Sequence, residues 1–113
     1  MKQEKTFEER ILYSTTLKNK YPDRVPVIIE KDPKCKEVGT IEKNKYLLPK
    51  TMHLSEIIII IRKNIKIDSS KAIFMFINGL LLPNSTTIGL VYHDHVSEDG
   101  FLYITYRSES TFG

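Results

Sequence analysis

The stretch Leu54-Ser55-Glu56-Ile57-Ile58-Ile59-Ile60-Ile61-Arg62-Lys63-Asn64 decides the fold, because it can be read as a strand or as a helix. Five consecutive isoleucines favour a strand by propensity. The flanks favour a helix, since Glu56 places negative charge at its start and Arg62 and Lys63 place positive charge at its end. We therefore predict a helix over residues 54–64.

Strand-like segments flank this helix on both sides. They are rich in β-branched and aromatic residues, which pack well on a pleated surface. Pro26 in the first segment lacks an N–H and should lie at a strand start or on an edge. Asn78-Gly79 is a strong hairpin signal, so residues 80–82 should return as a further strand. The segments are Arg24-Val25-Pro26-Val27-Ile28-Ile29-Glu30, Lys45-Tyr46-Leu47-Leu48-Pro49, Ala72-Ile73-Phe74-Met75-Phe76-Ile77 and Phe101-Leu102-Tyr103-Ile104-Thr105-Tyr106.

Two further helices complete the pattern. Residues 6–20 are loosely helical, with Phe7, Ile11 and Leu17 as the packing face, and Pro22 ends that helix. Residues 86–96 form a short helix or helical turn. The order is one helix followed by ββαββαβ, which predicts an α+β fold, a β-grasp sheet wrapped on a central helix. We divide the chain into an N-terminal helical extension (1–20), the β-grasp domain (21–106) and a flexible C-terminal tail (107–113).

Length and composition are those of an ordinary globular domain. The chain has 113 residues, of which 41% are hydrophobic and 27% charged. The five-isoleucine run is far too short to cross a bilayer, and the start shows no secretory signal, so we expect a cytoplasmic protein. Residues 1–50 carry 12 Lys/Arg against 8 Asp/Glu, whereas residues 51–113 carry 5 against 6. This asymmetry favours an acidic partner on the N-terminal half.

Catalytic and metal-binding chemistry find little support in the residues. His93-Asp94-His95 lacks further ligands at a sensible spacing, so solvated loop histidines are favoured over a metal site. Cys35 lies between Lys34 and Lys36, and we interpret it as an exposed surface thiol. The sequence shows no Gly-rich phosphate loop, no Ser-His-Asp arrangement and no paired catalytic carboxylates. We therefore expect no metal and no free cofactor.

Several motifs resemble those of one known family. Lys20-Tyr21-Pro22-Asp23-Arg24-Val25-Pro26-Val27-Ile28 is similar to the hallmark of the autophagy ubiquitin-like modifiers, the lipid-conjugated, GABARAP-like branch of the ubiquitin superfamily. The resemblance runs from about Phe7 to Gly113, nearly the whole chain. The other matching motifs are Lys45-Tyr46-Leu47-Leu48-Pro49, Ile61-Arg62-Lys63, Phe76-Ile77-Asn78, Glu98-Asp99, Phe101-Leu102-Tyr103-Ile104 and Glu109-Ser110-Thr111-Phe112-Gly113.

The resemblance implies a conjugation cycle that uses the tail, with Phe112 and Gly113 recognised by the enzymes. A cysteine protease exposes the terminal glycine, an activating enzyme captures it as a thioester, and a conjugating enzyme transfers Gly113 to phosphatidylethanolamine. Glycine has no Cβ, so its carboxyl group can enter a narrow enzyme channel. The modifier then recruits receptors on autophagosomal membranes. Whether Gly113 is encoded as the terminus or exposed by proteolysis stays open.

The resemblance also implies a receptor groove along residues 43–48. Partners would carry an aromatic-x-x-aliphatic motif with acidic flanks and would add a strand to the sheet edge. About half of the eleven pocket residues should be partly exposed. The aromatic pocket would use Leu17, Pro26, Leu47 and Phe101; the aliphatic pocket would use Tyr46, Leu48, Pro49, Met52, Ile57, Ile60 and Ile61; the acidic flank would meet Arg24, Lys43, Lys45 and Arg62.

Two departures from the family pattern put the motif preference in doubt. Tyr13 stands where relatives often carry an acid, and Ile57 and Ile58 replace the usual aromatics. A β-grasp adaptor that binds partners but is never conjugated stays open as an alternative. Nucleic acid is not an expected partner, because the basic half lacks interleaved aromatics for base stacking.

Overall fold

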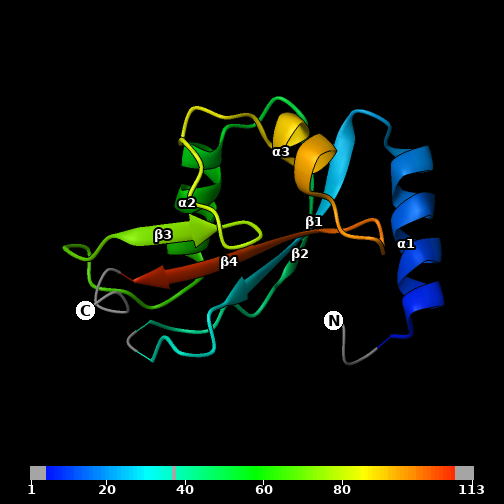
Figure 1. Cartoon of the computed structure of the whole chain (residues 1–113). Helices are drawn as coiled ribbons and strands as arrows, with labels where there is room; N and C mark the ends of the chain where they lie inside the picture. Colours follow the sequence, from blue (N-terminus) through cyan, green and yellow to red (C-terminus); the bar gives the residue numbers. More distant parts are fainter. Residues whose placement is uncertain (1–4, 37, 109–113) are drawn as a thin grey trace.

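A computed structural model describes residues 5–36 and 38–108 of the chain. Within them, helices and strands alternate in the order that the sequence predicts, apart from one strand (Figure 1). The central segment with five isoleucines is a helix, as predicted. The elements are α1 (Phe7–Lys20), β1 (Arg24–Lys31), β2 (Lys45–Pro49), α2 (Leu54–Lys63), β3 (Ile73–Phe76), α3 (Ile88–His95) and β4 (Leu102–Ser108).

The four strands form one mixed sheet in the order β2-β1-β4-β3. The central strands β1 and β4 are parallel, with Val27 opposite Leu102, and the two outer strands pair antiparallel to them. Parallel neighbours need a long crossover, and here all the elements from β2 to α3 supply it. Pro26 lies before the β4 ladder begins at Val27, so β1 is still an edge on that side, as its missing N–H requires. This arrangement is the predicted β-grasp.

The hydrophobic core lies between the sheet and the two later helices. Leu54, Ile57 and Ile61 follow the helical spacing i, i+3, i+7 and are almost completely buried, whereas Ile59 on the opposite face is 53% exposed. At the start of α2, the Glu56 carboxylate accepts the backbone N–H of His53 at 3.3 Å and contacts the His53 ring nitrogen at 3.1 Å. The apolar spacing and the charged ends together make this segment a helix.

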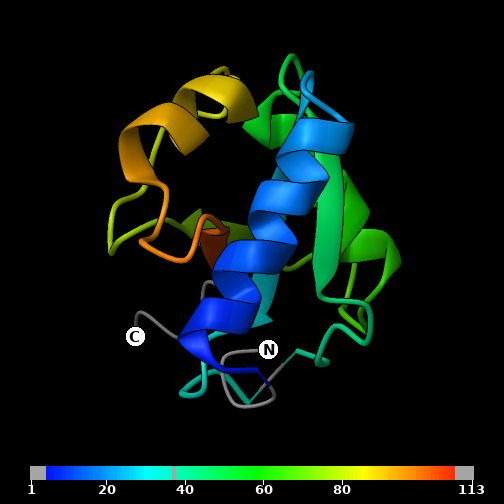
Figure 2. The ribbon, with the colours of Figure 1, turned by 90° about the vertical axis from the view of Figure 1, so that its right-hand side faces the viewer.

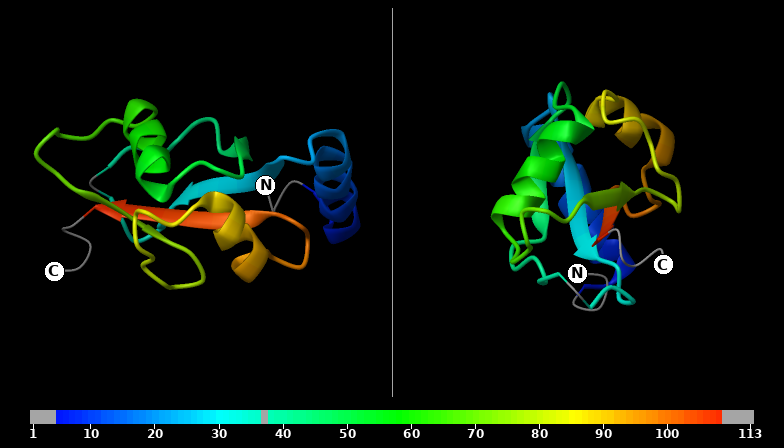
Figure 3. Two further views of the ribbon diagram at one scale, coloured as in Figure 1. Left: turned by 90° about the horizontal axis from the view of Figure 1, so that it is seen from above. Right: turned by 90° about the vertical axis from the view of Figure 1, so that its left-hand side faces the viewer.

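Helix α1 lies across the end of the sheet where β1 begins, away from β3 (Figures 2 and 3). A capping box begins it, in which Thr6 and Glu9 bond each other's backbone N–H at 3.0–3.1 Å. The predicted packing face is partly wrong, because Phe7 and Ile11 are 40% and 36% exposed. The residues turned toward the sheet follow the spacing i, i+3, i+4, i+7 but are largely polar: Arg10, Tyr13, Ser14 and Leu17.

Asp99, at the turn before β4, fastens α1 to the sheet. Its carboxylate is 3% exposed and accepts Arg10 Nε at 2.9 Å and the Tyr103 hydroxyl at 2.5 Å. The hydroxyl of Ser14 donates to the Asp99 carbonyl at 2.7 Å. Gly100 follows with φ +87°, and a Cβ there would collide with the Ser14 side chain. The turn therefore requires glycine for its backbone and for the close approach of α1.

The predicted fifth strand over residues 80–82 does not form. Asn78 and Gly79 have positive φ and make the expected tight turn, but only one bridge, Ile77 with Leu80, follows it. Leu80 and Leu81 are 50% and 57% exposed, and Pro83 lacks the N–H that a ladder needs. The segment leaves the sheet immediately after the turn.

Two further predictions near the end of β4 are wrong. The strand continues through Arg107 and Ser108, which the sequence assigns to the tail: Ser108 is fully buried, and Arg107 Nε lies 3.0 Å from Asp32 Oδ2. Cys35 is no surface thiol, since it is 1% exposed with its Sγ 3.5 Å from Ser108 Oγ. A turn closed by Cys35 N–H to the Asp32 carbonyl folds the thiol inward while the flanking lysines stay outside.

Candidate functional site

The free edge of β2 is the natural place for an added strand. Within the described residues β2 pairs with β1 alone, so its outer edge can take a further strand. The strand begins at Lys45, two residues later than the edge expected at residue 43. Its side chains alternate: Lys45 and Leu47 face α1, whereas Tyr46 and Leu48 face the core side.

A cleft of about 210 Å³ lies between α1 and β2 and is here called the β2 groove. It contains three of the four residues predicted for the aromatic pocket, together with two tyrosines and two lysines. The Tyr13 and Phe101 rings meet edge to face at 5.9 Å. Pro26 does not line it; it is buried beside Leu47, its partner in the ladder. The lining residues are Tyr13, Leu17, Lys43, Lys45, Tyr46, Leu47 and Phe101.

Lysines stand over the rings at the rim of the β2 groove. Lys43 Nζ is 5.2 Å from the Tyr46 ring centre, and Lys45 Nζ is 5.0 Å from that of Tyr13. The Tyr46 hydroxyl is buried, bonds to no described group, and has its pKa raised by that burial. The groove thus combines an apolar floor with a positive rim, which suits an apolar side chain flanked by acids.

The seven residues predicted for the aliphatic pocket fall into two groups, one in the core and one at the surface. Leu48, Ile57 and Ile61 are closed off in the core, with 6%, 0% and 0% exposure. The other four residues are half-buried on the β2–α2 side: Tyr46, Pro49, Met52 and Ile60. Six of the eleven predicted pocket residues are therefore half-buried, in line with the expected half.

The two arginines predicted for the acidic flank already make internal bonds. Arg24 Nη1 donates to the Leu47 carbonyl at 3.2 Å and stays exposed. Arg62 donates to the carbonyls of Lys71 at 2.8 Å and Ser69 at 3.3 Å, and so holds the loop after α2. Lys43 and Lys45 are thus the cations on the rim of the β2 groove itself.

Phe112 and Gly113, predicted as the tail recognition and conjugation residues, lie outside the described residues. The described chain ends at Ser108, at the end of the sheet opposite α1 (Figure 3).

The other sequence candidates stay separate from this site. His93, His95 and Asp94 lie in α3 rather than in a loop; His93 contacts Asp94 at 3.1 Å and His95 contacts the Asn78 amide at 3.3 Å. No three His, Cys, Asp or Glu side chains in the described part of the chain could hold a metal ion together. Among the same residues, no helix has the length and apolarity that a membrane span needs.

Sequence reasoning missed Tyr13 as a groove residue and Asp99 as the anchor of α1. The four-residue spacing of Tyr13 and Leu17 could have shown the first. For Asp99 the signal is weaker, because an acid before Gly100 is typical of any turn.

Known proteins resemble the chain over almost its full length. The family model "Autophagy protein Atg8 ubiquitin like" matches residues 9–113. Autophagy-related protein 8 of Schizosaccharomyces pombe is 46% identical over 96% of this chain and 88% of its own, and Autophagy-related protein 8e of Arabidopsis thaliana is 46% identical over 99% and 91%. The crystal structure of Trypanosoma brucei ATG8 superposes with a TM-score of 0.89 at 32% identity, covering 99% of this chain and 96% of that one.

The match spans both walls of the β2 groove, the sheet and the final glycine. By sequence and by fold, the chain belongs to the Atg8 family of autophagy-related ubiquitin-like proteins.

Proposed function

We propose that the protein is a modifier rather than an enzyme, and that it is conjugated through Gly113 to phosphatidylethanolamine. Family membership over residues 9–113 is the observation that carries this proposal. The free protein would be cytoplasmic and the conjugated form would lie on autophagosomal membranes. Its enzymatic partners would be an activating enzyme, a conjugating enzyme and a cysteine protease that reverses the linkage.

The chemistry needs only the terminal carboxylate of this chain. It attacks the α-phosphate of ATP and releases pyrophosphate, and a cysteine thiol of the activating enzyme then displaces AMP to form a thioester. After transfer to the conjugating enzyme, the lipid amine attacks the thioester, forms an amide and releases the thiol. The two acyl chains of one such lipid suffice for stable anchoring, whereas a single chain would not.

Reconstitution with the family's enzymes, ATP and phosphatidylethanolamine liposomes tests the conjugation. The wild-type chain should shift to a lipidated band on gel electrophoresis, and Gly113→Ala should block the shift because its methyl group does not fit the enzyme channel. A matched exposed substitution, Lys36→Ala, should leave the shift unchanged. A wild-type protein that stays unmodified would favour the alternative, a non-conjugated adaptor.

We further propose that the β2 groove binds receptors with aromatic-x-x-aliphatic motifs and acidic flanks. The open edge of β2, the apolar floor and the two rim lysines support it. Burying one apolar side chain in each pocket contributes roughly 1.5–3 kcal/mol, which implies micromolar binding once association costs are subtracted.

Calorimetry with a motif peptide tests the groove. Replacing Tyr46 and Leu47 together by alanine should abolish binding while circular dichroism shows an intact fold. Ile59→Ala is the matched control, because Ile59 is an exposed apolar residue outside the groove. Wild-type affinity in the folded double variant would remove the groove from the proposal.

A further inference from the structure

A second, larger cleft lies on the other side of α1. It has a volume of about 460 Å³ and is here called the α1–α3 cleft, because the end of α1 and the helix α3 form its walls. Figure 2 shows α3 beside the end of α1, with the two helices standing apart. Volumes of this size lie in the range of pockets that bind small ligands. It shares none of its lining residues with the β2 groove.

Backbone hydrogen bonds fix the walls of the α1–α3 cleft. Gly89 N–H, in the first turn of α3, donates to the Lys50 carbonyl at 2.9 Å, and Lys50 N–H donates to the Asp23 carbonyl at 3.0 Å. A Cβ on Gly89 would lie 2.9 Å from Lys50 Cβ, so only glycine allows this approach. Arg24 N–H donates to the Tyr21 carbonyl at 3.0 Å and turns the end of α1 into β1. The cleft is therefore preformed.

Its floor is apolar and its rim is positive. Val25 is 1% exposed, Val96 is 38% exposed, and the Tyr92 ring is held by its hydroxyl bond to the Gly100 carbonyl at 2.6 Å. Lys18 Nζ lies 5.6 Å from the centre of the Tyr92 ring. The nine described lining residues include the cations Lys18, Arg24 and Lys50, together with His93, and no acid.

We propose that the α1–α3 cleft is a second peptide site, which takes an acidic segment carrying one aromatic or bulky aliphatic side chain. The side chain would lie on the apolar floor of Val25, Tyr92 and Val96, and the acids would meet Lys18 and Lys50. An anionic lipid headgroup alone would use the rim but leave the floor unfilled. Charge complementarity and the apolar floor together therefore favour a peptide.

The position of the cleft supports a soluble partner, and this step rests on the proposed conjugation at Gly113. β4 runs from the α1 end of the sheet to Ser108 at the other end, so the described chain ends away from the cleft (Figure 3). Conjugation at Gly113, five residues beyond Ser108, would therefore leave the α1–α3 cleft accessible. One modifier could then bind a receptor motif in the β2 groove and an acidic peptide in the α1–α3 cleft at the same time.

The test is an NMR titration of the unconjugated 113-residue chain with the peptide acetyl-Glu-Glu-Phe-Glu-Glu-amide. This peptide lacks the aromatic-x-x-aliphatic motif, and a Leu47→Ala background suppresses the β2 groove further. We expect saturable shifts of the Gly89, Tyr92 and Val96 amides. Lys50→Glu or Lys18→Glu should weaken binding about tenfold by replacing attraction with repulsion.

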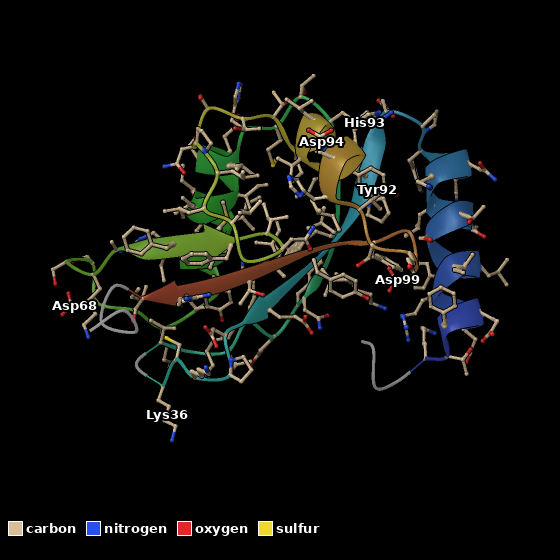
Figure 4. The ribbon with its side chains drawn as sticks, in the orientation of Figure 1. Lys36, Asp68, Tyr92, His93, Asp94 and Asp99 are labelled. Atoms are coloured by element: carbon tan, nitrogen blue, oxygen red, sulfur yellow. The ribbon has the colours of Figure 1, made fainter. Side chains whose placement is uncertain are left out.

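Matched controls separate this site from general attraction to positive charge. Lys36→Glu makes the same charge change on the opposite side of the molecule from Tyr92 and His93 (Figure 4) and should leave the affinity unchanged. A peptide with glycine in place of phenylalanine should lose saturable binding. Equal effects of Lys36→Glu and Lys50→Glu, or shifts confined to Tyr46 and its neighbours, would overturn the proposal.

Vesicles containing phosphatidylserine provide the other decisive comparison. If they shift the cleft amides and the peptide does not, the cleft binds a headgroup and the peptide proposal is refuted. Because the titration uses unconjugated protein, its failure leaves lipidation untouched. A failed lipidation reaction would likewise not change the result of the peptide titration.

Discussion

Replacing Asp99 by alanine should loosen the attachment of α1 to the turn before β4. This should lower the free energy of unfolding and disturb the β2 groove. The substitution removes the acceptor of three donors: Arg10 Nε at 2.9 Å, the Tyr103 hydroxyl at 2.5 Å and the Phe101 N–H at 3.0 Å. Breaking a buried ion pair costs about 3–5 kcal/mol, and each further buried donor about 1–3 kcal/mol. Arg10 keeps its bond to the Lys5 carbonyl at 2.7 Å, so we expect the total loss to lie near the sum of the lower limits, about 5 kcal/mol.

A loss of about 5 kcal/mol is a large share of the roughly 5–15 kcal/mol that stabilises a domain. At about 4 °C per kcal/mol for a chain of this size, the melting temperature should fall by about 20 °C. Motif-peptide affinity should fall as well, because Tyr13 and Leu17 on α1 form one wall of the β2 groove. Differential scanning calorimetry and isothermal titration measure the two effects.

Asp94→Ala is the matched control, since Asp94 also contacts a basic residue but is 55% exposed. Exposed pairs contribute little, so its stability should stay within about 0.5 kcal/mol of wild type. An Asp99→Ala protein that melts within about 2 °C of wild type would refute the anchoring role of Asp99 and the reasoning from its burial.

Three shorter predictions concern other parts of the core. Burial and the Asp99 carboxylate raise the pKa of Tyr103, so above pH 10, the ordinary value, the unfolded chain loses a proton that the folded chain keeps. In urea titrations the free energy of unfolding should therefore fall as the pH rises above about 10, less steeply in Tyr103→Phe; equal slopes would contradict this. Ile57→Ala should cost about 2–5 kcal/mol and Ile59→Ala under about 0.5 kcal/mol, whereas similar losses would argue against the helix orientation. Cys35 should react with a thiol reagent only after denaturant is added, and rapid reaction of the native protein would disprove its burial.

The sequence predicted elements best where pattern and flanking charge agreed. The helix over the five isoleucines was correct because Glu56, Arg62 and Lys63 outweighed β-propensity. The strand over residues 80–82 was wrong because the Asn78-Gly79 signal specifies only a turn. The ladder beyond that turn also needs backbone donors in the returning segment, and Pro83 supplies none. Local signals thus specified the turn but not the length of its strands.

Predictions failed most where polar residues do the packing. The buried face of α1 contains Arg10 and Ser14, whose partner Asp99 is 85 or more residues away along the chain. Apolar periodicity cannot find such a face, because it selects residues such as Phe7 and Ile11 in their place. Cys35 shows the same limit, because its flanking lysines indicate exposure while Ser108, distant in sequence, covers it.

The polar face of α1 has a consequence for binding, because consecutive residues of this helix serve different clefts. Leu17 lines the β2 groove and Lys18 lines the α1–α3 cleft, so the position of one helix sets the shape of both. Lys45 and Lys50 each line one cleft only, and reversing either charge should weaken that cleft alone. Asp99→Ala should weaken both together, because it releases the wall that they share. A selective effect of Asp99→Ala on one cleft would mean that α1 keeps its place without this anchor.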